Sequence, residues 1–120
     1  MTLIDINDCT GIYGIYIEET LVYIGKTTQS FRKRYMQHRH YIDFPNDSDT
    51  QYDMYIELAA AVANGRNVQL RPLLIVETVP YKSLYNLTNR DLESMEFALI
   101  HMLQPRYNVE GRRKPYRYTN

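Results

Sequence analysis

The chain has 120 residues, balances 14 Lys and Arg against 14 Asp and Glu, and is 44% hydrophobic, which fits one compact domain over residues 1–120. Its longest uninterrupted apolar runs, residues 58–63 and 73–76, are far too short to cross a bilayer, and we expect no membrane partner. No secretory signal opens the sequence and its single cysteine, Cys9, cannot form an internal disulfide, so we expect a cytoplasmic protein.

Positive charge is concentrated in two stretches, although the net charge is zero. Residues 26–39 hold five Lys or Arg and no acid, and residues 106–117 hold five against Glu110 alone. The rest of the chain is therefore acidic. Basic stretches of this kind are typical of proteins that contact nucleic-acid phosphates. The alternative is two solvated basic faces with no partner.

The first predicted element is a β-hairpin. Residues 11–17 and 21–25 are rich in β-branched and aromatic side chains, and the acidic turn Glu18-Glu19-Thr20 joins them. The turn lacks Gly and Asn, so the register of the hairpin stays open. A three-residue turn would place Tyr13 opposite Gly25 and on the same face as Tyr23, whereas a two-residue turn would place Tyr16 opposite Tyr23.

Two helices are predicted next. The first runs from Ser30 to about Ile42, with apolar or aromatic residues recurring at helical spacing, and a polar loop over residues 43–49 follows it. The second begins at a capping box, residues 50–53, and stops at Asn64-Gly65.

A third strand is predicted over residues 68–79, where Pro72 indicates an edge position or a bulge. A third helix begins at Thr88 or Asn89, with residues 88–91 as a capping box, and ends before Pro105. We expect the basic residues 109–120 to form a mobile tail. These elements predict an α+β fold, in which about three helices flank a small, largely antiparallel three-stranded sheet.

The third helix carries an anomalous carboxylate. Leu92, Met95, Leu99 and Leu103 form one apolar stripe at helical spacing, and Glu96 falls within it. An unpaired buried carboxylate costs several kcal/mol, so Glu96 requires a cation, strong hydrogen-bond donors or a cleft that reaches water. The alternative is a structural ion pair with an arginine at the edge of the core.

The first helix carries a polar line along the border of its apolar stripe, formed by Arg34, His38 and Tyr41. Arg34 is predicted to face a cleft, and His38 taken alone is best interpreted as a satisfied histidine at the edge of the core. Three further basic residues of this helix, Arg32, Lys33 and Arg39, are predicted on the outer surface, where they could touch phosphates.

Other chemistries are excluded by the motifs that they need. Gly25-Lys26-Thr27 lacks the earlier glycine of a phosphate-binding loop, since position 20 is Thr. The sequence contains no Gly-x-Ser-x-Gly elbow, and His38 and His40 diverge on a helix rather than forming a zinc site.

Five ordered elements carry a resemblance that covers nearly the whole chain: Gly11-Ile12-Tyr13, Tyr23-Ile24-Gly25-Lys26, residues 31–34, Glu96 and Pro105-Arg106-Tyr107-Asn108. Together the sequence resembles the GIY-YIG nuclease family. Residues 92–109 look most like the nuclease module of the bacterial excision-repair incision subunit, whereas residues 20–34 look more like small phage restriction-type endonucleases. The resemblance therefore implies a phage or mobile-element nuclease of that fold. The nine residues between Tyr13 and Tyr23 are one fewer than is usual in the family, a change that loops tolerate cheaply.

The resemblance implies a metal-dependent endonuclease that hydrolyses DNA and leaves 5′-phosphate and 3′-hydroxyl ends. It selects Tyr13 rather than Tyr16 as the tyrosine that orients or deprotonates water, a role that would need a lowered pKa. Arg34 would stabilise phosphate charge, and Glu96 would bind Mg²⁺, or alternatively Mn²⁺. The remaining catalytic candidates are Tyr23, His38 and Asn108, with Asn108 expected to hydrogen-bond an active-site group.

The expected partner is double-stranded DNA, held largely through its backbone. Its predicted contacts lie in the two basic stretches: Lys26, Arg32, Lys33, Arg39, Arg106, Arg112, Arg113 and Lys114. One site cuts one strand, so double-strand cleavage would need a homodimer, a higher oligomer or two encounters. Two alternatives stay open: a catalytically silent nucleic-acid-binding module or accessory subunit of the same fold, and an unrelated α/β interaction protein in which Glu96 pairs with Arg34.

Overall fold

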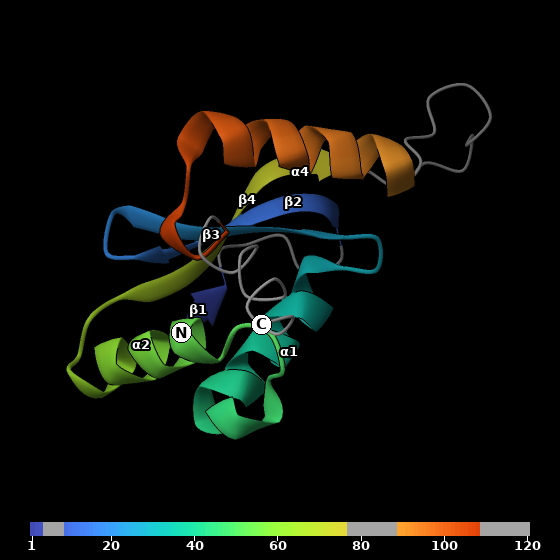
Figure 1. Cartoon of the computed structure of the whole chain (residues 1–120). Helices are drawn as coiled ribbons and strands as arrows, with labels where there is room; N and C mark the ends of the chain where they lie inside the picture. Colours follow the sequence, from blue (N-terminus) through green and yellow to red (C-terminus); the bar gives the residue numbers. More distant parts are fainter. Residues whose placement is uncertain (4–8, 77–88, 109–120) are drawn as a thin grey trace, which may run out of the picture.

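The computed structural model describes residues 1–3, 9–76 and 89–108, and its elements form three layers (Figure 1). Helix α4 covers one face of a central sheet, and helices α1 and α2 lie against the other. The sheet has the strand order β1-β4-β2-β3, so β3 forms one of its edges. The elements in chain order are β1 (Thr2–Leu3), β2 (Thr10–Ile17), β3 (Thr20–Thr27), α1 (Phe31–Asp43), η1 (Pro45–Asp47), α2 (Tyr52–Ala63), β4 (Val68–Val76) and α4 (Asn89–Leu103).

This architecture confirms the predicted α+β class. The three long strands β4, β2 and β3 pair antiparallel, as expected. Two short elements were not predicted: β1, which pairs parallel with Gln69 and Leu70 of β4, and the 3-10 turn η1 within the loop after α1.

Each face of the sheet buries its own cluster of apolar side chains. Successive side chains of β2 point to opposite faces of the sheet, so Tyr13, Ile15 and Ile17 share one face. They join Phe31 of α1 and Leu58 of α2 in the larger cluster. On the opposite face, Ile12 and Ile24 pack against Leu92 and Ile100 of α4. Apolar burial thus fixes the helices to both faces of the sheet. Buried polar residues such as His38 and Asn108 are exceptions in this core.

Tyr13 lies opposite Gly25 in the hairpin, as a three-residue turn was expected to place it, but the observed turn has a different length. The turn has two residues, because Ile17 pairs with Thr20. A bulge then leaves Val22 as an extra residue on β3, so the pairing shifts between Ile15 and Tyr16 and brings Tyr13 opposite Gly25. The expectation that a two-residue turn would put Tyr16 opposite Tyr23 was therefore wrong, since Tyr16 pairs with Leu21.

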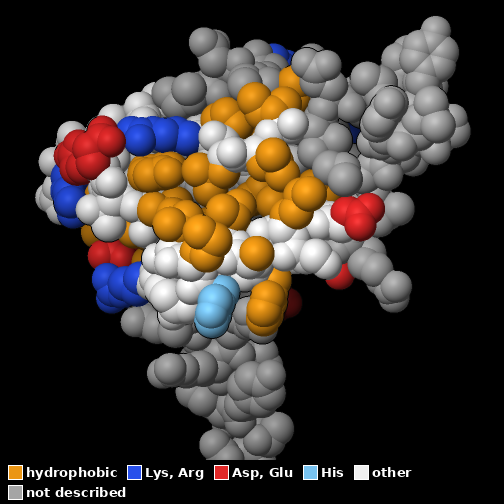
Figure 2. All heavy atoms as spheres, turned by 90° about the horizontal axis from the view of Figure 1, so that it is seen from above, with side chains coloured by type: hydrophobic (Ala, Val, Ile, Leu, Met, Phe, Trp, Pro, Cys, Tyr) orange, Lys and Arg blue, Asp and Glu red, His pale blue; other side chains and the backbone are white. Residues whose placement is uncertain are grey.

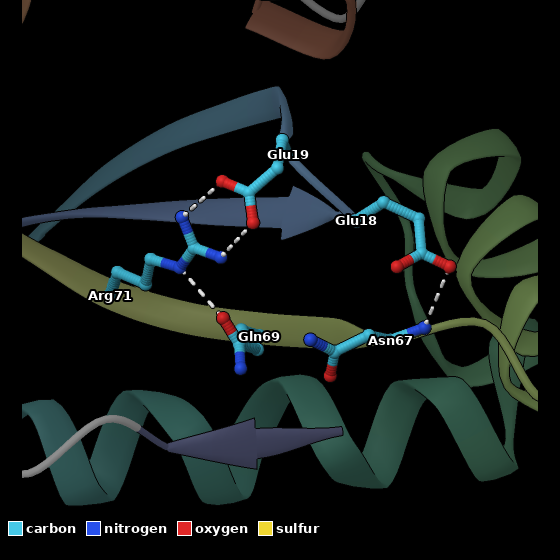
Figure 3. A network of polar contacts seen from close by, with 5 residues as sticks. All are labelled: Glu18, Glu19, Asn67, Gln69 and Arg71. Atoms are coloured by element: carbon cyan, nitrogen blue, oxygen red, sulfur yellow. Dashed lines mark hydrogen bonds and ion pairs between the residues drawn. The ribbon is translucent and has the colours of Figure 1, made fainter.

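The turn is held from the side by the start of β4 (Figure 3). Glu18 has a positive φ of 54°, and its backbone N–H donates to the carbonyl of Asn67 at 2.7 Å. Both amino nitrogens of the Arg71 guanidinium donate to the Glu19 carboxylate at 3.3 Å, and Arg71 Nε donates to Gln69 at 2.7 Å. These contacts explain how a turn without Gly or Asn keeps one conformation.

The boundaries of the first two helices largely match prediction. Ser30 caps α1, and its side chain accepts from the N–H of Lys33 at 3.1 Å. The predicted capping box at residues 50–53 is wrong, because Gln51 is the N-cap of α2 and makes no side-chain capping bond. The helix ends at Ala63 with Asn64 as its C-cap, and Gly65 follows with φ of 74°.

Strand β4 ends at Val76 in the described part of the chain, and the predicted strand residues 77–79 lie outside it. The predicted irregularity at Pro72 is confirmed, since Pro72 pairs with Tyr13 directly beside a bulge that leaves Leu73 unpaired with β2. The capping residue Thr88 and the tail 109–120 also lie outside the described residues.

The buried stripe of α4 differs from the predicted one. Leu92 and Ile100 face the sheet with Leu99 partly buried, whereas Met95 is 38% exposed and Leu103 is 50% exposed. The prediction failed because α4 is apolar on several sides. Glu96 is partly buried, one turn from both Leu92 and Ile100, so a carboxylate does lie on the face that meets the sheet.

Seen from above α4, hydrophobic side chains gather across the outer face of the molecule (Figure 2). The exposed large apolar residues of this helix are Met95, Phe97, Met102 and Leu103. In the described segments, none of the helices has the length and apolarity that a membrane span needs.

Candidate functional site

Two neighbouring hollows open at the β3 edge of the sheet, between α1 on one side and α4 on the other. Tyr23, Lys26 and Glu96 line both of them. The first, here called the polar hollow, has a volume of about 390 Å³ and is completed by Thr27, Thr28, Gln29, Arg34 and Gln37. The second, here called the mixed hollow, has a volume of about 430 Å³ and is completed by Ile24, Gln51, Glu93, Phe97, Ile100 and Asn108.

The structure thus brings Tyr23, Lys26, Arg34 and Glu96 to one place from three separate elements. Tyr23 and Lys26 project from β3, Arg34 lies on the first turns of α1, and Glu96 comes from the middle of α4. Burial raises the pKa of Tyr23, against a lowering by Arg34, and Glu96 raises it further, so this tyrosine keeps its proton at neutral pH. The cleft predicted from the polar character of Arg34 and Glu96 is present.

Tyr13 is completely buried beneath this site. Its ring lies 6.4 Å from that of Tyr23, and its hydroxyl lies 2.7 Å from His38 Nε2. Burial raises the pKa of Tyr13 well above its usual value, Tyr23 adds to the rise, and Arg34 opposes it. The lowered pKa that a water-deprotonating role would need is not what the protein groups alone produce, because the cost of burying a phenolate exceeds the benefit of the neighbouring cation.

His38 connects Tyr13 with α2. Its Nδ1 lies 2.6 Å from the hydroxyl of Tyr55, and its burial, followed by the charge of Arg34, lowers its pKa to about 3. The imidazole is thus neutral at pH 7. Arg34 Nε is a donor and cannot accept from the buried Tyr13 O–H, so we infer that this O–H donates to His38 Nε2 and that Nδ1–H donates to Tyr55. This agrees with the interpretation of His38 as a satisfied histidine at the core.

Arg34 is fixed at two points of its guanidinium. Nε donates to the Tyr13 hydroxyl at 3.4 Å, and an amino nitrogen donates to the side-chain oxygen of Gln37 at 2.7 Å. Burial acts to lower its pKa, but the neighbouring tyrosines Tyr13, Tyr23 and Tyr55 outweigh this effect, and the pKa is raised. Arg34 is therefore a permanent cation on the wall of the polar hollow. No ion pair between Arg34 and Glu96 occurs among the described contacts, so the alternative in which these two residues pair is not observed.

Glu96 is partly buried and lines both hollows, so its carboxylate is the candidate metal ligand of this site. Within residues 1–3, 9–76 and 89–108, no cluster of three or more His, Cys, Asp or Glu could hold a metal ion. A single carboxylate nevertheless fits Mg²⁺, which keeps several waters and commonly binds one or two carboxylates together with substrate phosphates. The donor set is a poor fit for zinc, which needs three or four protein ligands.

Asn108 has a different environment from the predicted one. Its Oδ1 accepts from the backbone N–H of Ile24 at 2.6 Å, and its Nδ2 donates to the carbonyl of the same residue at 2.8 Å. The amide thereby imitates a neighbouring strand at the outer edge of β3. The expected bond to an active-site group is not observed, because both functions of the amide are used by the backbone.

The predicted phosphate contacts fall into three groups. Lys26 lines both hollows and lies 3.8 Å from Glu93, whereas Arg32, Lys33 and Arg39 are exposed on α1. Arg106 is ion-paired with Glu57 of α2 at 3.2 Å and lines a separate hollow beside that helix, so the structure does not bring it to the site. The others lie outside the described residues: Arg112, Arg113 and Lys114.

Several residues of the site were not predicted, and four of them are described next. Tyr55 and Gln37 bind His38 and Arg34, and Gln51 and Phe97 line the mixed hollow. Gln37 is three residues from Arg34, a spacing at which helix side chains meet, so the sequence contained a signal for this contact. The other three depend on how distant elements pack.

Comparison with known proteins identified no relative of this chain. No family model matches the chain, and no curated protein or solved structure matches it significantly.

Proposed function

We propose that the protein is a metal-dependent endonuclease of the GIY-YIG type that hydrolyses phosphodiester bonds of DNA. The observation that carries the proposal is the meeting of Arg34 and Glu96 with Tyr23 and Lys26 at two joined hollows. A cation for the phosphate, a carboxylate for a metal and a polar group for water are the elements that phosphodiester hydrolysis requires. All of them come from the positions that the sequence resemblance selects.

The polar hollow is where the scissile phosphate would bind. The guanidinium of Arg34 would donate to its non-bridging oxygens, and its planar donors suit this role because charge builds on those oxygens as the bond breaks. Lys26 would add a second, more mobile positive charge. Because Arg34 is held by Tyr13 and Gln37, it reaches the phosphate without first losing conformational freedom.

Glu96 would hold one Mg²⁺, with Mn²⁺ as an alternative. A bound metal would supply Lewis-acid stabilisation of the phosphate and lower the pKa of a bound water. In the reaction, the water oxygen forms a bond to phosphorus, the bond from phosphorus to O3′ breaks, and one water proton ends on the 3′ oxygen. The products would carry 5′-phosphate and 3′-hydroxyl ends.

The two tyrosines would have separate roles. Tyr23 lines the hollows and would orient the attacking water through its neutral hydroxyl. Tyr13 is 0% exposed and keeps its proton, so we assign it the role of a positioning residue that holds Arg34 and His38 in place. This revises the water-deprotonating role that the resemblance implies for Tyr13.

The test is cleavage of supercoiled plasmid with Mg²⁺, with Mn²⁺ and with a chelator. We compare the wild type with Glu96→Gln, which keeps the size of the side chain and removes its charge. The matched control is Glu19→Gln at the hairpin turn, where an exposed pair with Arg71 is worth little. Nicking by the wild type and the control, abolished by the chelator and by Glu96→Gln, is the expected result.

The alternative is a silent nucleic-acid-binding module of the same fold. It would be favoured if the folded wild type binds plasmid, single-stranded or branched DNA but cleaves none of them with either metal. The surface that would bind DNA is the same in both cases, so binding alone does not separate them.

A further inference from the structure

The mixed hollow adjoins the proposed phosphate site but differs from it in chemistry. Lys26 and Glu96 line both hollows, but only the polar hollow contains Arg34, and only the mixed hollow contains Glu93 and the apolar side chains of Phe97 and Ile100. With one more carboxylate, Glu93, and without Arg34, the mixed hollow suits a second phosphate group less well than the polar hollow does. An uncharged, flat and largely apolar group suits these walls better.

Phe97 is the side chain that brings an aromatic ring to this hollow apart from Tyr23. It lines the mixed hollow and leaves 55% of its surface exposed, next in sequence to the proposed metal ligand Glu96. An exposed aromatic ring beside a phosphate site is a typical platform for a nucleobase, because every base has a face that stacks.

The far wall supplies polar contacts. Gln51, the N-cap residue of α2, is partly buried and carries both a donor and an acceptor that can meet the edge of a base. Asn108 forms part of the wall but its amide is occupied by Ile24. A volume of about 430 Å³ is within the range of small-molecule sites and accommodates one base with its water.

A base within a paired duplex cannot enter such a hollow, because it is stacked on both faces. Resting on the nuclease function proposed above, we propose that the mixed hollow binds the unstacked base of the nucleotide next to the scissile phosphate, with Phe97 as its stacking platform. The preferred substrate is then a strand with an unpaired or extruded nucleotide at the cut site. Unpaired bases are favoured because they avoid most of the cost of unstacking.

The experiment uses two duplexes that differ only in one unpaired 2-aminopurine, a fluorescent base. The wild type is expected to cleave the bulged duplex about 5- to 100-fold faster than the paired one, from the usual strength of base stacking on an aromatic ring. Phe97→Leu keeps an apolar side chain but removes the stacking face, and its ratio of rates should approach one. Phe97→Tyr should keep the preference.

The matched control is Met102→Ala, an apolar residue of the same helix that is 74% exposed and does not line either hollow in the described structure. It should keep the wild-type ratio. Thermal unfolding of each variant shows whether it is folded.

A second readout does not depend on cleavage. Stacking quenches 2-aminopurine, so the bulged duplex should lose fluorescence on binding the wild type and Phe97→Tyr, but not Phe97→Leu. Equal cleavage of both duplexes by an active wild type would overturn the base site and leave the nuclease function intact. Failure to cleave either duplex would overturn the nuclease function, and quenching that depends on Phe97 would then still support the base site, while its absence would overturn it.

Discussion

Gly25 lies directly opposite Tyr13 on the neighbouring strand, and the space that a side chain would occupy at Gly25 is filled by the tyrosine ring. A Cβ added at Gly25 would overlap the hydroxyl and the ring of Tyr13. The glycine and the tyrosine of the two motifs are thus one packing unit, in which the absence of a side chain on β3 lets the Tyr13 hydroxyl reach His38 and Arg34.

Gly25→Ala is therefore expected to destabilise the fold. The ring of Tyr13 cannot move aside without breaking its hydrogen bonds, and overpacking of this kind costs about 3 kcal/mol. Urea unfolding measures the effect. Gly14→Ala is the comparison, because its added Cβ meets the mobile end of Leu21 at 2.6 Å and should cost less. Equal losses for the two variants would contradict the proposed packing unit.

Asn108→Asp tests the clamp on β3, which is the pair of hydrogen bonds between the Asn108 amide and the backbone of Ile24. The introduced carboxylate can still accept from the N–H of Ile24, but it places an oxygen against the carbonyl to which Nδ2 donates. Protonation restores a donor, so the folded state raises the pKa of the new carboxyl. Its destabilisation should grow as the pH rises above about 3.9, the value in the unfolded chain. Asn46→Asp in η1, which is exposed, should show no such trend.

His38 is expected to make stability depend on pH. Burial, followed by Arg34, lowers its pKa to about 3, whereas the unfolded residue titrates near about 6.5. Between these values the unfolded state binds more protons, so the free energy of unfolding falls as the pH falls, by about 1.4 kcal/mol per pH unit at most. Urea unfolding between about pH 7 and about pH 5 measures the slope, an interval chosen to avoid most carboxylate titration.

The control for this slope is a pair of variants. His38→Gln removes the titrating group and should flatten the dependence, even if it lowers stability at every pH. His101→Gln, which removes an exposed histidine in the last turn of α4, should leave the slope as in the wild type. A flat wild-type curve would be inconsistent with a buried neutral imidazole.

Arg34→Lys is expected to lower the single-turnover cleavage rate by about 10²-fold or more, because an ammonium cannot donate to Tyr13 and Gln37 and still present two planar donors to phosphate. The charge is kept, so DNA binding should change much less. Arg66→Lys, exposed before β4, serves as the control. A rate within a few-fold of the wild type would remove Arg34 from the proposed reaction.

The exposed cations of α1 should act on binding rather than on chemistry. Lys33→Ala is expected to weaken DNA binding and to reduce the salt slope, the change of log affinity with log salt, by about 0.9 if its side chain meets one phosphate. Fluorescence anisotropy between about 50 mM and about 200 mM salt measures the slope. Arg66→Ala should leave it unchanged, and an identical slope for both variants would place the DNA elsewhere.

Local sequence patterns predicted the helices and strands of this fold well, but predicted less well which face of each element is buried. Alternation and helical spacing identified the hairpin, α1, α2 and α4, because each of these segments has consistent propensities along its length. The face of α4 could not be predicted, since apolar residues surround the helix and only the sheet decides which of them are covered. Glu96 was the informative residue because a carboxylate is costly where Leu is not.

The register of the hairpin illustrates a second limit. In a regular hairpin the length of the turn decides on which face of the sheet Tyr13 lies, but the bulge at Val22 makes the face independent of the turn length. A bulge depends on twist and on packing against neighbouring elements, which local propensity does not encode. Contacts over long separations, such as those of Asn108 with Ile24 and of His38 with Tyr55, likewise required the folded structure.

The clamp formed by Asn108 also bears on how the protein avoids associating with itself. An outer strand offers free N–H and carbonyl groups to any extended segment, and such edges are where β-aggregation begins. At Ile24, a side-chain amide already occupies both groups, so a foreign strand cannot continue the sheet past this point without displacing it. The same contact that shapes one wall of the mixed hollow therefore protects the motif strand from misassembly.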